Sequence, residues 1–124
     1  MKLHQQMNSR SNFIQAYDPG GFVVQGIHHG DGLLVGADWL VSPWGPETAE
    51  QLGAEHFSRL LEYSLEILIL GTGQRQKMLL SLAGALRQHA QAVEIMDSSA
   101  ACRTYNILLA EDRRVAAALL PVRT

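Results

Sequence analysis

The chain has 124 residues, a net charge of −2 and one cysteine, and 47% of its residues are hydrophobic. This length and apolar content are typical of one globular domain with a buried core. The charge gives no electrostatic reason to expect nucleic acid or an anionic membrane as a partner. No apolar run approaches the ~20 residues of a membrane-spanning helix, and a single cysteine excludes an intrachain disulfide and is typical of a reducing compartment.

The beginning of the chain predicts a tail followed by a β-hairpin. Residues 1–12 are polar and lack the apolar core of a signal peptide, so we expect a flexible tail before a single domain that spans 13–124. Phe13–Tyr17 and Phe22–Ile27 have strand-like composition. The turn sequence Asp18–Gly21 joins them, and it predicts that the two strands pair as a hairpin.

The β pattern continues beyond this hairpin. A second turn at residues 30–32 precedes two more strand-like segments, Leu33–Val35 and Trp39–Val41. Pro43 and Pro46 end the pattern, because proline cannot donate a hydrogen bond to a strand ladder.

A helical pattern then begins at Thr48, which has the spacing of a capping box with Gln51. We expect this helix to be weakened at Gly53. The next piece is predicted to bury one face, formed by Phe57, Leu60 and Leu61.

The second half alternates apolar strands with amphipathic helices. The predicted strands are Glu66–Leu70, Ala92–Met96 and Val115–Leu120, and the predicted helices are Gln76–His89 and Ala100–Glu111. The first helix has an apolar stripe made of Met78, Leu79, Leu82, Ala83 and Leu86. The last strand has no polar residue, so we expect it inside the sheet. This alternation is the pattern of an α/β fold.

Gly71, Thr72 and Gly73 follow a buried strand and precede a helix, where dinucleotide-binding folds hold a pyrophosphate. Asp97 ends the next strand, where such folds place a ribose-binding acid. Gln76, however, stands in the position of the third glycine of the fingerprint. A tight turn explains the two glycines equally well, and we therefore predict no tight NAD or ATP binding and no cofactor.

The start of the last helix gathers the polar residues that could bind a ligand. Asp97, Ser98 or Ser99 can accept hydrogen bonds from the free N–H groups there. Those N–H groups also make an anion site, to which Arg103 would contribute one turn later. The helical period places Arg103 and Asn106 away from the buried face, which is made of Ala101, Tyr105, Leu108 and Leu109. An ordinary capped helix with a solvated arginine is the alternative.

Cys102 lies at the edge of that buried face. Its place early in a helix and its neighbour Arg103 favour a thiolate, and hence a reactive thiol. The alternative, which we favour, is a small side chain packed beside Tyr105 and Leu109.

His28, His29 and Asp31 are metal-capable residues. Adjacent strand residues point to opposite faces, so the two histidines cannot both face one ion without a bulge. His29 and Asp31 could share an ion but supply only two ligands, and we predict no metal site.

Trp39 and Trp44 flank a loop that contains proline and glycine. They could cap the sheet or belong to a contact surface, since tryptophan is enriched at binding hot spots. The spacing leaves both alternatives open.

Three segments carry a family resemblance: Glu66–Gly73 (EILILGTG), Val93–Asn106 (VEIMDSSAACRTYN) and Glu111–Pro121 (EDRRVAAALLP). They resemble the family of small domains of unknown biochemical function that includes the mitochondrial complex I assembly factor 3 and the adipogenesis-associated Mth-type domain protein. The run Ala-Cys-Arg-Thr-Tyr-Asn after a Met-Asp turn is the specific part of the match.

The resemblance implies a three-layer α/β fold with a mixed central sheet and a β-rich N-terminal part, and no established enzymatic activity. It implies a non-catalytic, protein-binding assembly or maturation factor, and we expect a bacterial member in the cytoplasm. The turn Met96–Ser99, with Arg103 and Asn106, would contact the partner. The alternative is a small-molecule- or nucleotide-binding enzyme or sensor that uses the cleft near Gly71–Gly73 and Asp97–Cys102.

Overall fold

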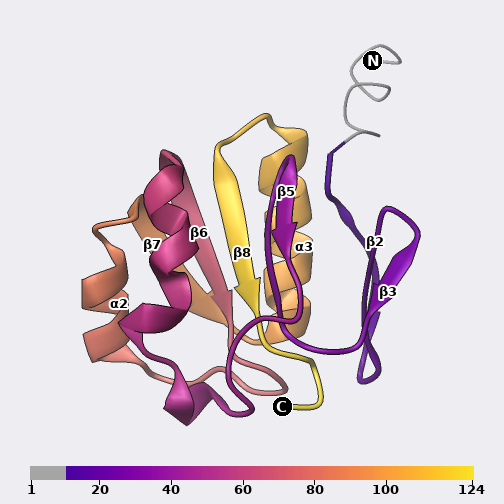
Figure 1. The fold of residues 1–124 in the computed structure, drawn as a ribbon, viewed down its shortest axis with the longest axis horizontal. Helices are drawn as coiled ribbons and strands as arrows, with labels where there is room; N and C mark the ends of the chain where they lie inside the picture. Colours follow the sequence, from indigo (N-terminus) through magenta and orange to yellow (C-terminus); the bar gives the residue numbers. More distant parts are fainter. Residues whose placement is uncertain (1–10) are drawn as a thin grey trace.

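A five-stranded mixed sheet lies at the centre of the computed structural model, which describes residues 11–124 (Figure 1). Across the sheet the strands are β5 (Trp39–Val41), β4 (Leu33–Gly36), β8 (Val115–Leu119), β6 (Leu65–Gly71) and β7 (Ala90–Met96). β8 runs parallel to β6 and antiparallel to β4, and β7 is parallel to β6. The sheet is therefore mixed, as predicted.

The last strand occupies the middle of the sheet. Every residue of β8 is buried, and Ala116, Ala117 and Ala118 are wholly inaccessible. Its small side chains allow layers to pack closely on both faces of the sheet. The prediction that this apolar run lies inside the sheet is confirmed.

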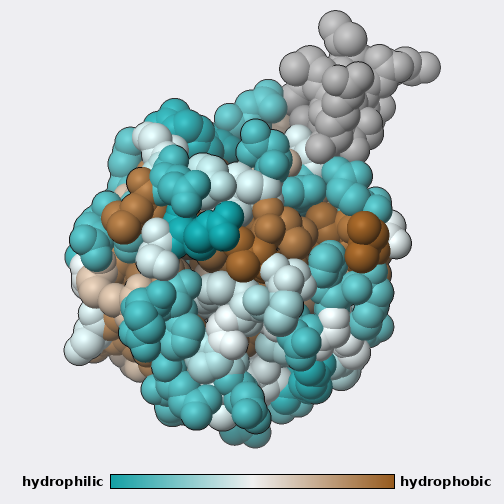
Figure 2. Space-filling model, in the orientation of Figure 1, coloured by the Kyte–Doolittle hydropathy of each residue, from teal (hydrophilic) through white to brown (hydrophobic). Residues whose placement is uncertain are grey.

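One face of the sheet is covered by α3 (Ser98–Ala110) and by a separate antiparallel sheet of β1 (Ile14–Asp18), β2 (Gly21–Val24) and β3 (Ile27–His29). The helix buries the predicted stripe, with Ala101, Tyr105 and Leu109 at most 4% exposed. Figure 2 shows a hydrophobic band across the middle of the molecule, from the region of β5 towards β2 and β3, between hydrophilic areas.

The other face is covered by the 3-10 helices η1 (Ala49–Gln51) and η2 (Ala54–Glu62) and by α2 (Leu80–Leu86). Phe57, Leu60 and Leu86 are fully buried there. Helical layers on both faces complete the predicted three-layer α/β fold. No helix within residues 11–124 is long and apolar enough to cross a membrane.

The predicted single strand Phe22–Ile27 is wrong, because the chain reverses within it. Gln25 and Gly26 have φ angles of 51° and 76°, and they form a turn that sends β3 back along β2. Positive φ at both central residues of a two-residue turn matches the twist of a hairpin. Apolar residues lie on either side of this turn, so the strand-like pattern of the sequence continues through it and does not indicate a turn.

Two helical predictions also fail. The predicted helix Gln76–His89 is shorter in the structure, where α2 spans only Leu80–Leu86. The residues before Leu80 form a loop held by side-chain hydrogen bonds, and Met78 is 79% exposed there. The Gln76 side chain donates to the Ile95 carbonyl at 3.1 Å. β7 is an edge strand, so this hydrogen bond pairs a carbonyl that no neighbouring strand reaches. Leu61 was predicted to be buried but is 72% exposed, since η2 turns with the tighter 3-10 period.

The predicted flexible tail lies outside the described residues over positions 1–10. Asn12, which the prediction counted with the tail, is held in the fold. Its side chain donates to the Gly36 carbonyl at 3.1 Å and to the Trp39 carbonyl at 3.0 Å. Asn12 therefore ties the start of the domain to the β4–β5 hairpin.

Candidate functional site

Ser98 joins the two loops that were predicted to form a site. Its hydroxyl donates to the Leu120 carbonyl at 2.6 Å and accepts from the Gly73 N–H at 2.8 Å. The Ser98 N–H donates in turn to the Gly73 carbonyl at 2.8 Å. Ser98 is fully buried, so this residue connects the ends of β6 and β8 to the start of α3 and presents no polar group to a ligand.

The two glycines of the loop are required by close packing. A Cβ at Gly71 would lie 3.0 Å from the Ser98 Cα atom. Gly73 has a φ of 102°, and a Cβ there would lie 2.8 Å from the Cβ of Thr124. The fold therefore needs both glycines without any bound phosphate.

Thr72 closes the same loop on itself. Its N–H donates to the Met96 carbonyl at 2.9 Å, and its hydroxyl accepts from the Lys77 N–H at 3.2 Å. The residue is 1% exposed. Thr72 thus fixes the loop between β6 and α2 against the end of β7.

Asp97, one of the three residues predicted as candidates, caps α3. Its carboxylate accepts from the Ala100 N–H at 2.9 Å and its carbonyl accepts from the Ala101 N–H at 2.9 Å. The Ser98 N–H is already bound to Gly73. N–H groups that could have held an external anion are thus paired within the chain, and a carboxylate already interacts favourably with the positive end of the helix dipole.

Cys102 is fully buried among the core residues under α3. Burial raises its pKa to about 12, although the neighbouring Arg103 acts in the opposite direction. A thiol in this state is protonated near neutral pH and is a poor nucleophile. These observations support the packing alternative for Cys102.

Arg103 and Asn106 both face the small sheet, but only Arg103 is exposed. The Arg103 guanidinium donates through Nη1 to the hydroxyl of Tyr17 at 2.7 Å. Asn106 is half-buried, and its amide accepts from the Ile14 N–H and donates to the Ile14 carbonyl, both at 2.9 Å. The prediction of an exposed Asn106 is therefore wrong, because its side chain completes the backbone hydrogen bonding of β1.

The histidines of the third strand do not form a metal site. His29 contacts the Ser42 hydroxyl through Nδ1 at 2.9 Å, and His28 is exposed. Within residues 11–124, no group of three histidine, cysteine, aspartate or glutamate side chains could hold a metal ion.

The two tryptophans lie with the core on the α2 side of the sheet, away from α3. Trp44 is 8% exposed and packs edge-on against Phe57, with ring centroids 5.4 Å apart. Trp39 is half-buried and stacks on Tyr63 at 4.3 Å, with the ring planes 8° apart. The tryptophans therefore lie on the side of the sheet opposite Arg103.

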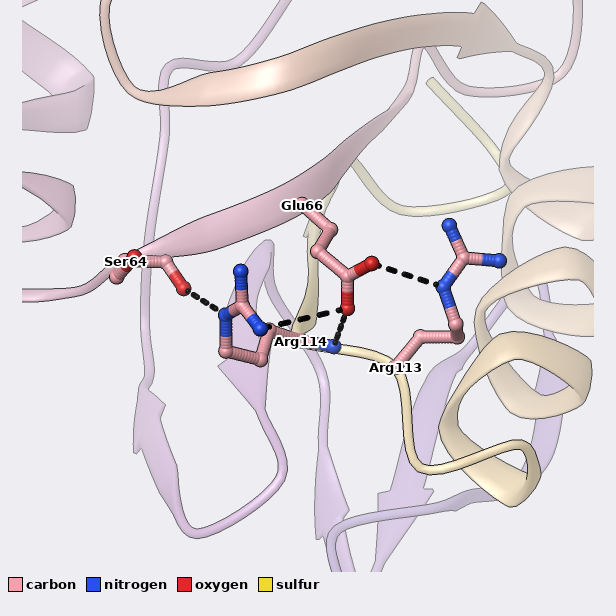
Figure 3. A network of polar contacts seen from close by, with 4 residues as sticks. All are labelled: Ser64, Glu66, Arg113 and Arg114. Atoms are coloured by element: carbon pink, nitrogen blue, oxygen red, sulfur yellow. Dashed lines mark hydrogen bonds and ion pairs between the residues drawn. The ribbon is translucent and has the colours of Figure 1, made fainter.

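A charged cluster at the opposite end of the sheet was not predicted (Figure 3). Glu66 accepts from the Arg113 Nε at 3.2 Å and from the Arg114 N–H at 3.0 Å. These bonds hold the pKa of Glu66 below its usual value, and the bond from the Arg114 N–H has the largest effect. β6 and β8 are parallel neighbours and Ile67 is opposite Val115, so Glu66, near the start of β6, meets the two arginines that precede β8. Residues at the starts of neighbouring parallel strands lie close together, so the cluster could have been predicted once β6 was paired with β8.

None of the predicted binding residues around Gly71–Gly73 and Asp97–Asn106 lines either of two cavities formed by residues 11–124. The first, of about 510 Å³, lies beside the C-terminal segment, where Arg123 donates to the carbonyls of Pro19 and Gly30 at 2.9 Å. The second, of about 440 Å³, lies beside the arginine cluster. The polar residues around the start of α3 therefore hold the domain together, while the cavities lie elsewhere.

The fold belongs to the class of Mth938-like domains. A solution structure of a Bordetella pertussis protein with such a domain is 29% identical, with a TM-score of 0.76 over 90% of this chain and 87% of that chain. A crystal structure of a Bordetella parapertussis protein is 33% identical, with a TM-score of 0.79 over 90% of this chain and 96% of that one.

The chain is a member of the family described as protein of unknown function (DUF498/DUF598), whose profile matches residues 14–120. The human protein named NADH dehydrogenase [ubiquinone] 1 alpha subcomplex assembly factor 3 is 33% identical over 124 aligned positions, which cover 98% of this chain and 67% of the human protein. The resemblance predicted from the three segments is confirmed.

Proposed function

We propose that this protein is a non-catalytic binding domain that contacts a protein partner during the assembly or maturation of a larger complex. The similarity to the human assembly factor over nearly the whole chain carries this proposal. The arrangement around α3 supports it, because the polar residues there build a rigid helix rather than an open reaction site.

The outer side of α3 is the surface that we assign to the partner. Arg103 is exposed and held by the Tyr17 hydroxyl, and Ile107 is 60% exposed one turn later. Residues four apart on a helix are neighbours, so a cation and an apolar side chain lie next to each other. Arginine beside an apolar group is a common composition of binding hot spots. A carboxylate next to an apolar residue on the partner would complement this pair.

The pull-down that tests this proposal compares two double variants with the unmodified protein in its native host. Arg103→Ala with Ile107→Ala removes the proposed contact, and its matched control is Arg87→Ala with Leu80→Ala, an exposed arginine and a 73% exposed leucine in the layer on the other side of the sheet. We expect a specific partner to be lost with the first pair and kept with the second, both variants being folded. Equal recovery by both would remove the outer side of α3 from the proposal.

A nucleotide-binding enzyme or sensor is the competing function, and it makes a different prediction. Because Gly73, Asp97 and Ser98 are paired with one another and with the backbone, we expect ATP and NAD to produce no saturable rise in the melting temperature. A saturable rise with either nucleotide would favour the competing function.

A further inference from the structure

The cavity of about 440 Å³ lies where the β4–β5 turn, the end of η2 and the C-terminal end of α3 meet. Its volume falls within the range of about 300–1,000 Å³ that is usual for ligand pockets. α3 has 13 residues, which corresponds to a length of about 20 Å. The cavity is therefore well separated from the helix start, and the inference below goes beyond the proposed function.

The inner surface of the cavity is largely apolar. Leu65, Leu109 and Val115 line it, and each is at most 7% exposed. Tyr63 also lines the cavity, and its ring is held by the stack on Trp39. An aromatic wall that is already fixed in place reduces the ordering cost of binding an apolar side chain.

The two arginines that line the cavity share one carboxylate. Glu66 lies between them, with the Arg113 Nε at 3.2 Å and the Arg114 Nη1 at 3.8 Å. Arg114 also donates through Nε to the Ser64 carbonyl at 3.0 Å. Figure 3 shows both guanidinium groups oriented around this one carboxylate and the neighbouring backbone. The contacts within the chain therefore hold both arginines in place as part of the cavity's lining.

Two carboxylates of other elements line the cavity as well. Asp38 lies at the β4–β5 turn and Glu62 at the end of η2, and both line the cavity together with the two arginines that share Glu66. The ion pair between Glu62 and Arg59 spans 3.7 Å and both side chains are more than half exposed, so solvent screens it. Asp38 and Glu62 are therefore the groups of this cavity that complement a positive charge on a bound segment.

We propose that this cavity binds a segment of a partner protein that inserts one large apolar side chain and places a lysine or arginine beside it. The apolar side chain would contact Leu65, Leu109 and Val115. The basic residue would pair with Asp38 or Glu62 at the rim. Burial of the apolar group supplies affinity, and the charges supply orientation and selectivity among segments.

Three blocked tripeptides test the proposal by nuclear magnetic resonance of the whole protein. One carries phenylalanine between two lysines, the second phenylalanine between two glutamates, and the third serine between two lysines. We expect saturable shifts at the amides of Ser64 and Val115 and at the Trp39 indole N–H with the first peptide. Binding of the other two should be at least about tenfold weaker, a difference of about 1.4 kcal/mol.

Charge-removing variants separate this cavity from other surfaces. Asp38→Asn with Glu62→Gln should weaken the lysine–phenylalanine peptide about tenfold, whereas Glu47→Gln, an exposed carboxylate outside this cavity, should leave binding unchanged. Shifts centred elsewhere, no saturation, or an unchanged affinity in the double variant would overturn the proposal. Equal or tighter binding of the glutamate peptide would also overturn it, and would point to anion binding by Arg113. None of these outcomes changes what the α3 variants show in the pull-down, so a failure of this proposal can be distinguished from a failure of the proposed function.

Discussion

Replacement of Ser98 by alanine should be one of the most destabilising single changes outside the apolar core. The hydroxyl satisfies the carbonyl of Leu120 and the N–H of Gly73, and both residues are buried. Ser98→Ala leaves these two backbone groups without a partner. An unsatisfied buried polar group costs about 1–3 kcal/mol, so the lower half of that range gives a loss of about 3 kcal/mol for the pair.

Urea unfolding followed by circular dichroism measures this loss directly. For a domain of this size, about 3 kcal/mol corresponds to a fall of about 10 °C in melting temperature. Ser99→Ala is the matched control, because Ser99 is the next residue of α3 and is only half-buried, and it should change stability by less than about 0.5 kcal/mol. In Ser98→Ala the Gly73 amide should also exchange with solvent faster.

Two results would refute this reasoning. One is a loss below about 1 kcal/mol, which would mean that the freed groups find other partners at little cost. The other is an equal loss in Ser98→Ala and Ser99→Ala, which would assign the effect to the helix start in general and not to the bonds that join β6, β8 and α3.

Three further predictions follow from buried groups and from the backbone. Tyr105 is fully buried and its hydroxyl donates to the Asn12 carbonyl at 2.8 Å, so calorimetry should give losses of about 3–5 kcal/mol for Tyr105→Ala and about 1 kcal/mol for Tyr105→Phe. The pKa of Cys102 is raised from 9.0 to about 12 in the folded protein, so stability should be level below about pH 9 and then fall by up to about 1.4 kcal/mol per pH unit. Urea unfolding between pH 8 and 10 checks this, because the buried Tyr105 hydroxyl, whose pKa is also raised by burial, adds a second slope above that range. Cys102→Ala should flatten the slope between pH 9 and 10. Gly73→Ala forces a Cβ into contact with Thr124 at a φ of 102° and should cost about 1–3 kcal/mol, whereas Gly84→Ala, in open space on α2, should stabilise by about 0.5–1 kcal/mol.

The second half of the fold could be predicted because its strongest sequence signals agree with the tertiary structure. β8 has no polar residue and β6 has none between Glu66 and its end, so the place of both strands inside the sheet follows from composition. The 3.6-residue period and the Asp97 cap likewise predict α3 to within two residues of its start. Local pattern and global packing agree in these elements.

The failures lie where a distant residue decides the outcome. A period of 3.6 residues places Asn106 away from the core, but the carbonyl and N–H of Ile14, 92 residues earlier, bind its side chain. The turn at Gln25 and Gly26 has apolar neighbours on both sides, so its β pattern continues through the reversal. Local sequence cannot supply contacts of this range.

The position of the candidate site could be predicted, but not whether its hydrogen-bonding groups are open to a ligand or already paired within the chain. Gly73, Asp97 and Ser98 were expected to come together, and they do. Spacing could not reveal that their donors and acceptors are mutually satisfied, since that depends on Leu120 at the end of a strand that pairs with β6. A helix start that is open to ligands and one that is closed by its own chain have the same sequence pattern.

The position of β8 has a consequence for synthesis on the ribosome. β4 and β6 each pair with β8 and not with each other, although β8 comes after all the other strands in the chain. Until Val115–Leu119 leaves the exit tunnel, a nascent chain therefore has two strand edges in the middle of the future sheet that carry unpaired backbone groups. Such edges favour association with other chains. We expect release from the tunnel, and not the earlier formation of the β1–β3 hairpins, to set the moment at which the central sheet closes, and a nascent chain stalled before Val115 should be a good substrate for chaperones.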